Sequence, residues 1–162
     1  CRFYPTAWLS ARVRREVRLS KALQALDYDY VLLDSAPTEG VLTHNVITAA
    51  DLLLVPVQMG GGAIEGVEPL LELATELRDG EDMPYRLFLT MFDRRTTRTN
   101  TTVVDRLRRH RKNLLKTYIA KSEQLNQANL ESRPIAAHAP GARGVREFDA
   151  LAKDVVAVAR RL

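Results

Sequence analysis

The stretch Tyr28–Gly40, with the sequence YDYVLLDSAPTEG, decides the fold class of this chain. Its run Tyr30–Leu33 is short, apolar and rich in β-forming residues, which predicts a central parallel strand covered on both faces. Asp34 then stands at the carboxyl end of that strand, where open α/β sheets place their ligand crevice. A carboxylate at this position typically holds Mg²⁺, directly or through water, beside the phosphates of a nucleotide. The stretch therefore has the form of a Walker B element.

Strand and helix patterns alternate on either side of this stretch. Apolar runs predict further strands over Leu52–Val57, Arg86–Met91 and Leu115–Ile119. Helices are expected over residues 9–26, 41–50, 64–78, 102–113, 122–131 and 145–162, with a loop over 133–144. The spacing of Thr102 and Asp105 predicts a capping box at the start of the fourth of these helices. The alternation indicates an α/β fold, with a doubly wound, mostly parallel sheet and helices on both faces, in a single domain over residues 1–162.

The bulk composition is that of an ordinary globular domain. The chain has 162 residues, of which 46% are hydrophobic and 27% charged. No apolar run approaches the roughly 20 residues needed to span a bilayer, so no membrane segment is expected. The single cysteine excludes an internal disulfide and favours a cytoplasmic setting.

The charge of the chain is unevenly distributed. Residues 94–116 carry nine Lys and Arg against one acidic residue, whereas residues 65–82 carry seven acidic residues and one arginine. This asymmetry predicts a face for a polyanion rather than a uniformly basic surface. No aromatic residue lies between the arginines, so stacking on the bases of single strands is not expected.

Two other kinds of site are not expected. The three histidines, His44, His110 and His138, have no acidic or cysteine partner at metal-ligand spacing, which argues against zinc. The chain also lacks a G-x-S-x-G elbow and a cysteine with a plausible partner histidine, so nucleophilic catalysis is not indicated.

Further motifs follow Asp34 in a fixed order. They are LLVPVQMGGGAIEG at 53–66, LTMFDRRT at 89–96, IAKSEQ at 119–124 and GVREF at 144–148. In order and spacing, over about 130 residues, the chain resembles the C-terminal portion of the ParA/MinD family of deviant-Walker ATPases, and its ParA branch most closely.

The resemblance implies a partition ATPase with a P-loop NTPase-like fold that uses ATP and Mg²⁺. It implies that Asp34 is catalytic and positions Mg²⁺ or the attacking water, and that Pro37 and Lys121 lie with Asp34 at the nucleotide. It also implies nonspecific binding of double-stranded DNA, through Arg94, Arg95, Arg98, Arg108, Arg109, Lys112 and Lys121. The implied partners are a ParB-like protein that stimulates hydrolysis and a second copy in a homodimer, at the nucleoid and without membrane attachment.

The phosphate-binding loop of that family is absent from the sequence. No Gly-Lys pair occurs in the 162 residues, and Gly60–Gly62 is not followed by lysine and Ser/Thr at the required spacing. The chain by itself is therefore expected to lack ATPase activity, because the loop supplies most of the N–H donors that hold phosphates. One interpretation is a segment of a longer ATPase. The alternatives are a non-catalytic module that binds DNA or a ParA partner, and another positioning ATPase related to MinD.

Overall fold

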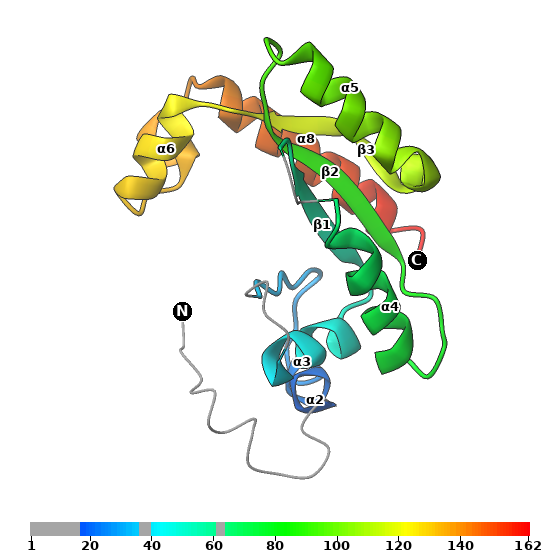
Figure 1. Ribbon diagram of the computed structural model, residues 1–162. Coiled ribbons are helices and arrows are strands. Elements are labelled where there is room, and N and C mark those ends of the chain that lie inside the picture. The colour runs from blue at the N-terminus through cyan, green and yellow to red at the C-terminus, as the bar shows by residue number, and fades with distance from the viewer. Residues whose placement is uncertain (1–16, 36–39, 61–63) are drawn as a thin grey trace. The chain divides into compact units, whose positions relative to one another are not determined.

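The computed structural model describes residues 17–35, 40–60 and 64–162 (Figure 1). The chain divides into two compact units. Unit 1 comprises the chain up to Leu53 together with Leu70–Pro84, and unit 2 comprises Leu54–Pro69 together with Tyr85–Leu162.

A three-stranded sheet, in the order β1-β2-β3, is the framework of unit 2. The strands are β1 (Leu53–Gln58), β2 (Tyr85–Phe92) and β3 (Leu114–Ala120). β2 and β3 pair in parallel, with Phe92 opposite Ala120. These bounds confirm the three strands predicted after Asp34, with each end differing by one residue.

Both faces of β2 are buried. Phe88 forms a core cluster with Ile119 of β3 and Leu151 of α8 (Arg143–Ala159), which runs behind the sheet in Figure 1. Leu87 and Leu89 alternate with Phe88 along the strand, so they face the other side, and they are only 0% and 8% exposed. A parallel strand covered on both faces confirms the predicted α/β class with helices on both sides of the sheet.

The helix after β2 begins earlier than the sequence predicts. α5 covers Thr97–Arg106 and is followed by the 3₁₀-helix η2 (Leu107–Asn113). The predicted capping box is wrong, because the hydroxyl of Thr102 donates to the carbonyl of Arg98 at 3.0 Å, one turn back inside the helix. The chain instead turns into α5 at Asp93, whose carbonyl accepts the N–H of Thr96 at 3.1 Å.

Two short helices precede α8. α6 (Glu123–Leu130) confirms the predicted helix, whereas α7 (Ile135–His138) forms inside the predicted loop. α7 follows Pro134, and the carbonyl of Pro134 accepts the N–H groups of Ala137 and His138 at 2.9 Å.

Unit 1 contains α2 (Arg18–Leu23), α3 (Val41–Ala49) and, from Leu70 onward, α4 (Val67–Leu77). Asn45, only 1% exposed, joins the first two of these helices. Its Oδ1 accepts the backbone N–H of Leu19 at 3.1 Å, and its Nδ2 donates to the carbonyl of Val41 at 2.7 Å. A polar side chain thus holds α2 against α3.

The prediction of a buried central strand over Tyr30–Leu33 is wrong for this structure. Residues 26–35 have no regular secondary structure, and Tyr30, Val31 and Leu32 are 50%, 43% and 88% exposed. A strand exists only where another strand offers its backbone N–H and C=O groups. None of the described strands pairs with this segment, so its apolar residues remain in solvent.

Candidate nucleic-acid interface

Two arginines from distant parts of the sequence meet at one tyrosine of unit 2. Arg94 follows β2, Tyr118 lies near the end of β3, and Arg143 is the first residue of α8. Nη2 of Arg94 donates to the hydroxyl oxygen of Tyr118 at 2.9 Å, and Nη2 of Arg143 donates to the same oxygen at 3.4 Å. The guanidinium of Arg143 also lies 5.9 Å from the centre of the Tyr118 ring. The hydroxyl of Tyr118 therefore binds two guanidinium groups at the carboxyl end of the sheet.

The electrostatics of this cluster favour negative charge. The hydrogen bond from Arg94 lowers the pKa of Tyr118, and the charges of Arg94 and Arg143 lower it further, against an opposing effect of burial. The same hydrogen bond raises the pKa of Arg94. A site that stabilises a phenolate also suits other anions, such as a phosphate oxygen.

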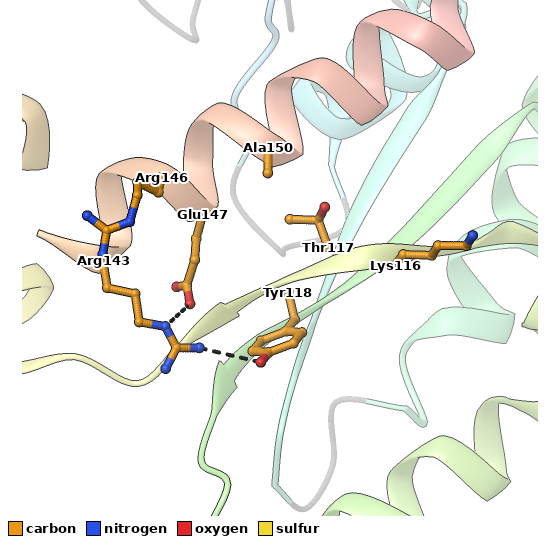
Figure 2. A pocket seen from close by; sticks show the side chains of 7 residues that line it. All are labelled: Lys116, Thr117, Tyr118, Arg143, Arg146, Glu147 and Ala150. Atoms are coloured by element: carbon orange, nitrogen blue, oxygen red, sulfur yellow. Dashed lines mark hydrogen bonds and ion pairs between the residues drawn. The ribbon is translucent and has the colours of Figure 1, made fainter.

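Glu147 of α8 connects this cluster to the end of β3. Its Oε1 accepts from Nε of Arg143 at 2.6 Å, and its Oε2 accepts the backbone N–H of Ala120 at 2.9 Å. Figure 2 shows the side chain between the helix and the strand, with Arg143 reaching on to Tyr118. The pocket around these groups has a volume of about 410 Å³ and is lined by Lys116, Thr117, Tyr118, Arg143, Arg146, Glu147 and Ala150 (Figure 2).

The turn after β2 holds a second arginine against a carboxylate. Nε and Nη2 of Arg95 donate to the two oxygens of Asp93, the shorter contact being 2.7 Å. The backbone N–H of Arg95 also donates to Oδ1 of Asp93 at 3.0 Å. This paired guanidinium lowers the pKa of Asp93 to about 2. Arg95 remains 86% exposed, so the pair faces solvent.

The remaining cations of the basic segment (residues 94–116), together with Lys121 just after it, fall into two groups. In the first, Arg106 pairs with Glu65 at 3.3 Å and Arg109 with Glu68 at 3.0 Å. The second group is exposed and makes no ion pair with any described residue; it includes the predicted DNA-binding residues Arg98, Arg108, Lys112 and Lys121.

The buried end of η2 is fixed by a histidine. His110 is 6% exposed, its Nε2 lies 2.9 Å from Glu68, and its Nδ1 lies 2.9 Å from the hydroxyl of Tyr85. Each ring nitrogen of His110 therefore has a polar partner, the carboxylate of Glu68 on one side and the phenol of Tyr85 on the other. His110 thus anchors η2 to the body of unit 2, while the arginines on either side of it in the sequence remain exposed.

The predicted nucleotide residues lie in different units of the chain or outside its described part, so the nucleotide site stays a prediction. Asp34 is exposed on the irregular segment of unit 1, Pro37 lies outside the described residues, and Lys121 follows β3 in unit 2. Among the described residues, no three His, Cys, Asp or Glu side chains come together as a metal site. These residues alone do not fit ATP and Mg²⁺, because a carboxylate without a phosphate-binding loop supplies few of the required donors and ligands.

The sequence prediction missed Arg143 and Arg146, and it missed Tyr118 and Glu147, the two residues that orient Arg143. A signal was present for the arginines. Both lie in the first turns of α8, where cations oppose the positive end of the helix dipole. Basic residues at such a position are unfavourable for the helix alone, which points to another role. Tyr118 and Glu147 carried no comparable signal, since their importance depends on contacts between distant segments.

Comparisons with known proteins agree with the earlier resemblance. A family model described as an AAA domain matches residues 6–86, half of the chain. The chain is 35% identical to the sporulation initiation inhibitor protein Soj of Bacillus subtilis, over 90% of this chain and 59% of that protein. It is 37% identical to the chromosome-partitioning ATPase Soj of Thermus thermophilus, over 86% of this chain and 57% of that protein. The chain thus spans less than two thirds of these relatives.

A solved structure supports the fold. It is that of a plasmid partition protein from Borrelia burgdorferi, with a TM-score of 0.59 and 23% identity, covering 69% of this chain and 47% of that one.

The helices of the described residues include none that combines the length and apolar character of a membrane span.

Proposed function

The chain belongs to the ParA/MinD family of ATPases, and from this premise we propose that it is the DNA-contacting part of a ParA-like partition ATPase. The whole protein would segregate DNA with ATP, dimerise, and release DNA when a ParB-like partner stimulates hydrolysis. Relatives named as chromosome-partitioning ATPases and a ParA protein of Myxococcus xanthus support this assignment. Residues 1–162 would belong to one ATPase domain of that protein.

The observation that carries the DNA-binding proposal is the meeting of Arg94 and Arg143 at Tyr118. Arginine presents planar, paired N–H groups that match phosphate oxygens. The phenol holds both guanidiniums at the surface, which reduces the conformational freedom that they would lose on meeting a phosphate. The amino end of the 17-residue α8 adds partial positive charge at the same place.

The exposed cations around this cluster extend the proposed face. Arg98, Arg108, Lys112 and Lys121 would contact further phosphates, and Arg95 and Arg109 would do so after exchanging their carboxylate partners. Phosphate contacts carry no sequence information, so we expect binding without sequence preference. We also expect strong weakening by salt, because each neutralised phosphate releases condensed counterions.

The nucleotide part of the proposal applies to the whole-length protein. There, Asp34 would be the catalytic residue that positions Mg²⁺ or water, and Pro37 and Lys121 would lie beside the nucleotide. In that protein a phosphate-binding loop, which is absent from these 162 residues, would complete the site. The 162-residue chain alone should show no ATPase activity.

Fluorescence anisotropy of two labelled duplexes of unrelated sequence would test DNA binding. We expect equal affinity for the two duplexes and a steep loss of affinity between about 50 mM and about 200 mM salt. The double variant Arg94→Ala, Arg143→Ala should weaken binding to both duplexes alike. Absence of binding at the lower salt concentration, or a strong preference for one duplex, would contradict the proposal.

A further inference from the structure

Glu147 is a carboxylate placed among the cations of the proposed DNA face. We propose that it is a positioning residue, which holds Arg143 and the backbone before Lys121 in the arrangement that receives DNA phosphates. This inference rests on the proposed function.

Glu147 and Tyr118 together orient the side chain of Arg143. Glu147 takes the Nε hydrogen of Arg143 at 2.6 Å, and Tyr118 takes one hydrogen of Nη2 at 3.4 Å. Two points of contact orient the plane of a guanidinium. Nη1 of Arg143 has no hydrogen-bond partner among the described residues, so it is available to a phosphate oxygen. The side chain of Glu147 is 13% exposed while that of Arg143 is 49% exposed, so the carboxylate supports the arginine from beneath.

Glu147 also fixes the end of β3. The other oxygen of Glu147 accepts the N–H of Ala120, the last residue of the strand, at 2.9 Å. The next N–H, that of Lys121, donates to the carbonyl of Phe92 at 2.9 Å. The backbone from which Lys121 projects is therefore fixed by α8 on one side and by β2 on the other. One carboxylate thus sets the position of two cations from different segments.

The sign of the charge makes this role testable. A carboxylate beside phosphates repels them, so a bystander at this position would weaken DNA binding, and its neutralisation would strengthen binding. A positioning carboxylate predicts the opposite, because its loss releases Arg143 and the end of β3. The two roles therefore predict changes in affinity of opposite sign.

The experiment compares Glu147→Gln with Asp149→Asn in the anisotropy assay. Asp149 lies on the same helix, is exposed and makes no ion pair with any described residue, so it reports the effect of charge alone. We expect Glu147→Gln to weaken binding about threefold or more and to reduce the salt slope by about 0.9, the value of one phosphate contact. Asp149→Asn should leave binding unchanged or slightly tighter.

Two further variants separate position from charge and from folding. Glu147→Asp keeps the charge but shortens the side chain by one methylene, so it cannot span from Arg143 to Ala120 as Glu147 does. We expect weakened binding here too, with an unchanged circular dichroism spectrum. In an Arg143→Ala background, Glu147→Gln should cause a smaller loss than in the unmodified chain, since most of its effect passes through that arginine.

The outcomes distinguish this inference from the proposed function. If the unmodified chain does not bind duplex DNA, both are overturned. If it binds and Glu147→Gln and Glu147→Asp bind as well or better, only the positioning role is overturned. The same conclusion follows if Asp149→Asn weakens binding as much as Glu147→Gln does.

Discussion

Two pairs of cations in one stretch of unit 2 provide a matched test of the proposed DNA face. Arg108 and Lys112 lie on η2, are exposed and make no ion pair with a described residue. Arg106 and Arg109 come from the same stretch but form ion pairs with acidic side chains at 3.3 and 3.0 Å. The double variants Arg108→Ala, Lys112→Ala and Arg106→Ala, Arg109→Ala each remove two positive charges. A purely long-range attraction therefore predicts equal losses of affinity.

The expected losses differ because only unpaired cations reach phosphates without giving up a partner. Each phosphate contact contributes about 0.9 to the slope of log affinity against log salt. Loss of Arg108 and Lys112 should therefore reduce the slope by about 1.8. When the salt concentration rises from about 50 to about 200 mM, the affinity of both proteins for DNA falls. The fold decrease for this variant should be about 12 times smaller than the fold decrease for the unmodified chain. We expect less than about half of that slope change from the Arg106 and Arg109 variant.

The assay is the anisotropy titration of a duplex at four or more salt concentrations, with thermal unfolding as the folding control. Exposed substitutions of this kind should alter the free energy of unfolding by no more than about 0.5 kcal/mol. Equal slope changes in the two double variants would refute the reasoning, as would a larger change in the variant that removes the paired arginines. Either result would mean that the ion pairs do not determine which cations contact DNA.

Further predictions concern the core, the hydrogen bond between Arg94 and Tyr118, and the ion pair in the turn after β2. Leu87→Ala, at a fully buried position of β2, should lower the free energy of unfolding by about 2–5 kcal/mol in a denaturant titration, because it leaves a cavity in the core. Arg94→Ala should raise the pKa of Tyr118 toward that of free tyrosine, measured by phenolate absorbance with Tyr118→Phe as the reference. Asp93, whose pKa is lowered from 3.8 to about 2, should contribute stability that is fully present above pH 3.8 and is lost as the pH falls through about 2. In carboxyl NMR titrations, Arg95→Ala should return that pKa toward 3.8; an unchanged value would show that Arg95 does not cause the shift.

The alternation of strands and helices could be predicted from the sequence because it depends on local patterns. β1, β2 and β3 are short apolar runs bounded by polar or turn residues, and such runs form strands wherever a neighbouring strand is available. The order of motifs from residue 53 to residue 148 likewise requires no tertiary information to indicate a family. The sequence also shows directly that no Gly-Lys pair is present. This absence leads to the expectation that the chain alone does not hydrolyse ATP.

Prediction from local patterns was wrong where the secondary structure depends on contacts with a distant segment of the chain. Tyr30–Leu33 has the composition of a buried strand, yet strand formation needs hydrogen bonds to another strand, and the described residues provide none for it. The start of α5 was misplaced for a related reason. Thr102 has capping-box spacing, but the turn at Asp93 starts the helix earlier and leaves Thr102 inside it.

The sequence by itself determined the fold class, the family resemblance and the position of the basic segment, since these depend on the order and type of neighbouring residues. Only the tertiary structure decided which cations lie together. Tyr118 joins residues 94 and 143, and Glu147 joins α8 to the end of β3, through hydrogen bonds between atoms that are distant in the chain. The structure also divided the basic segment into paired and unpaired cations, because whether a carboxylate lies within about 4 Å of a guanidinium is a property of the folded chain.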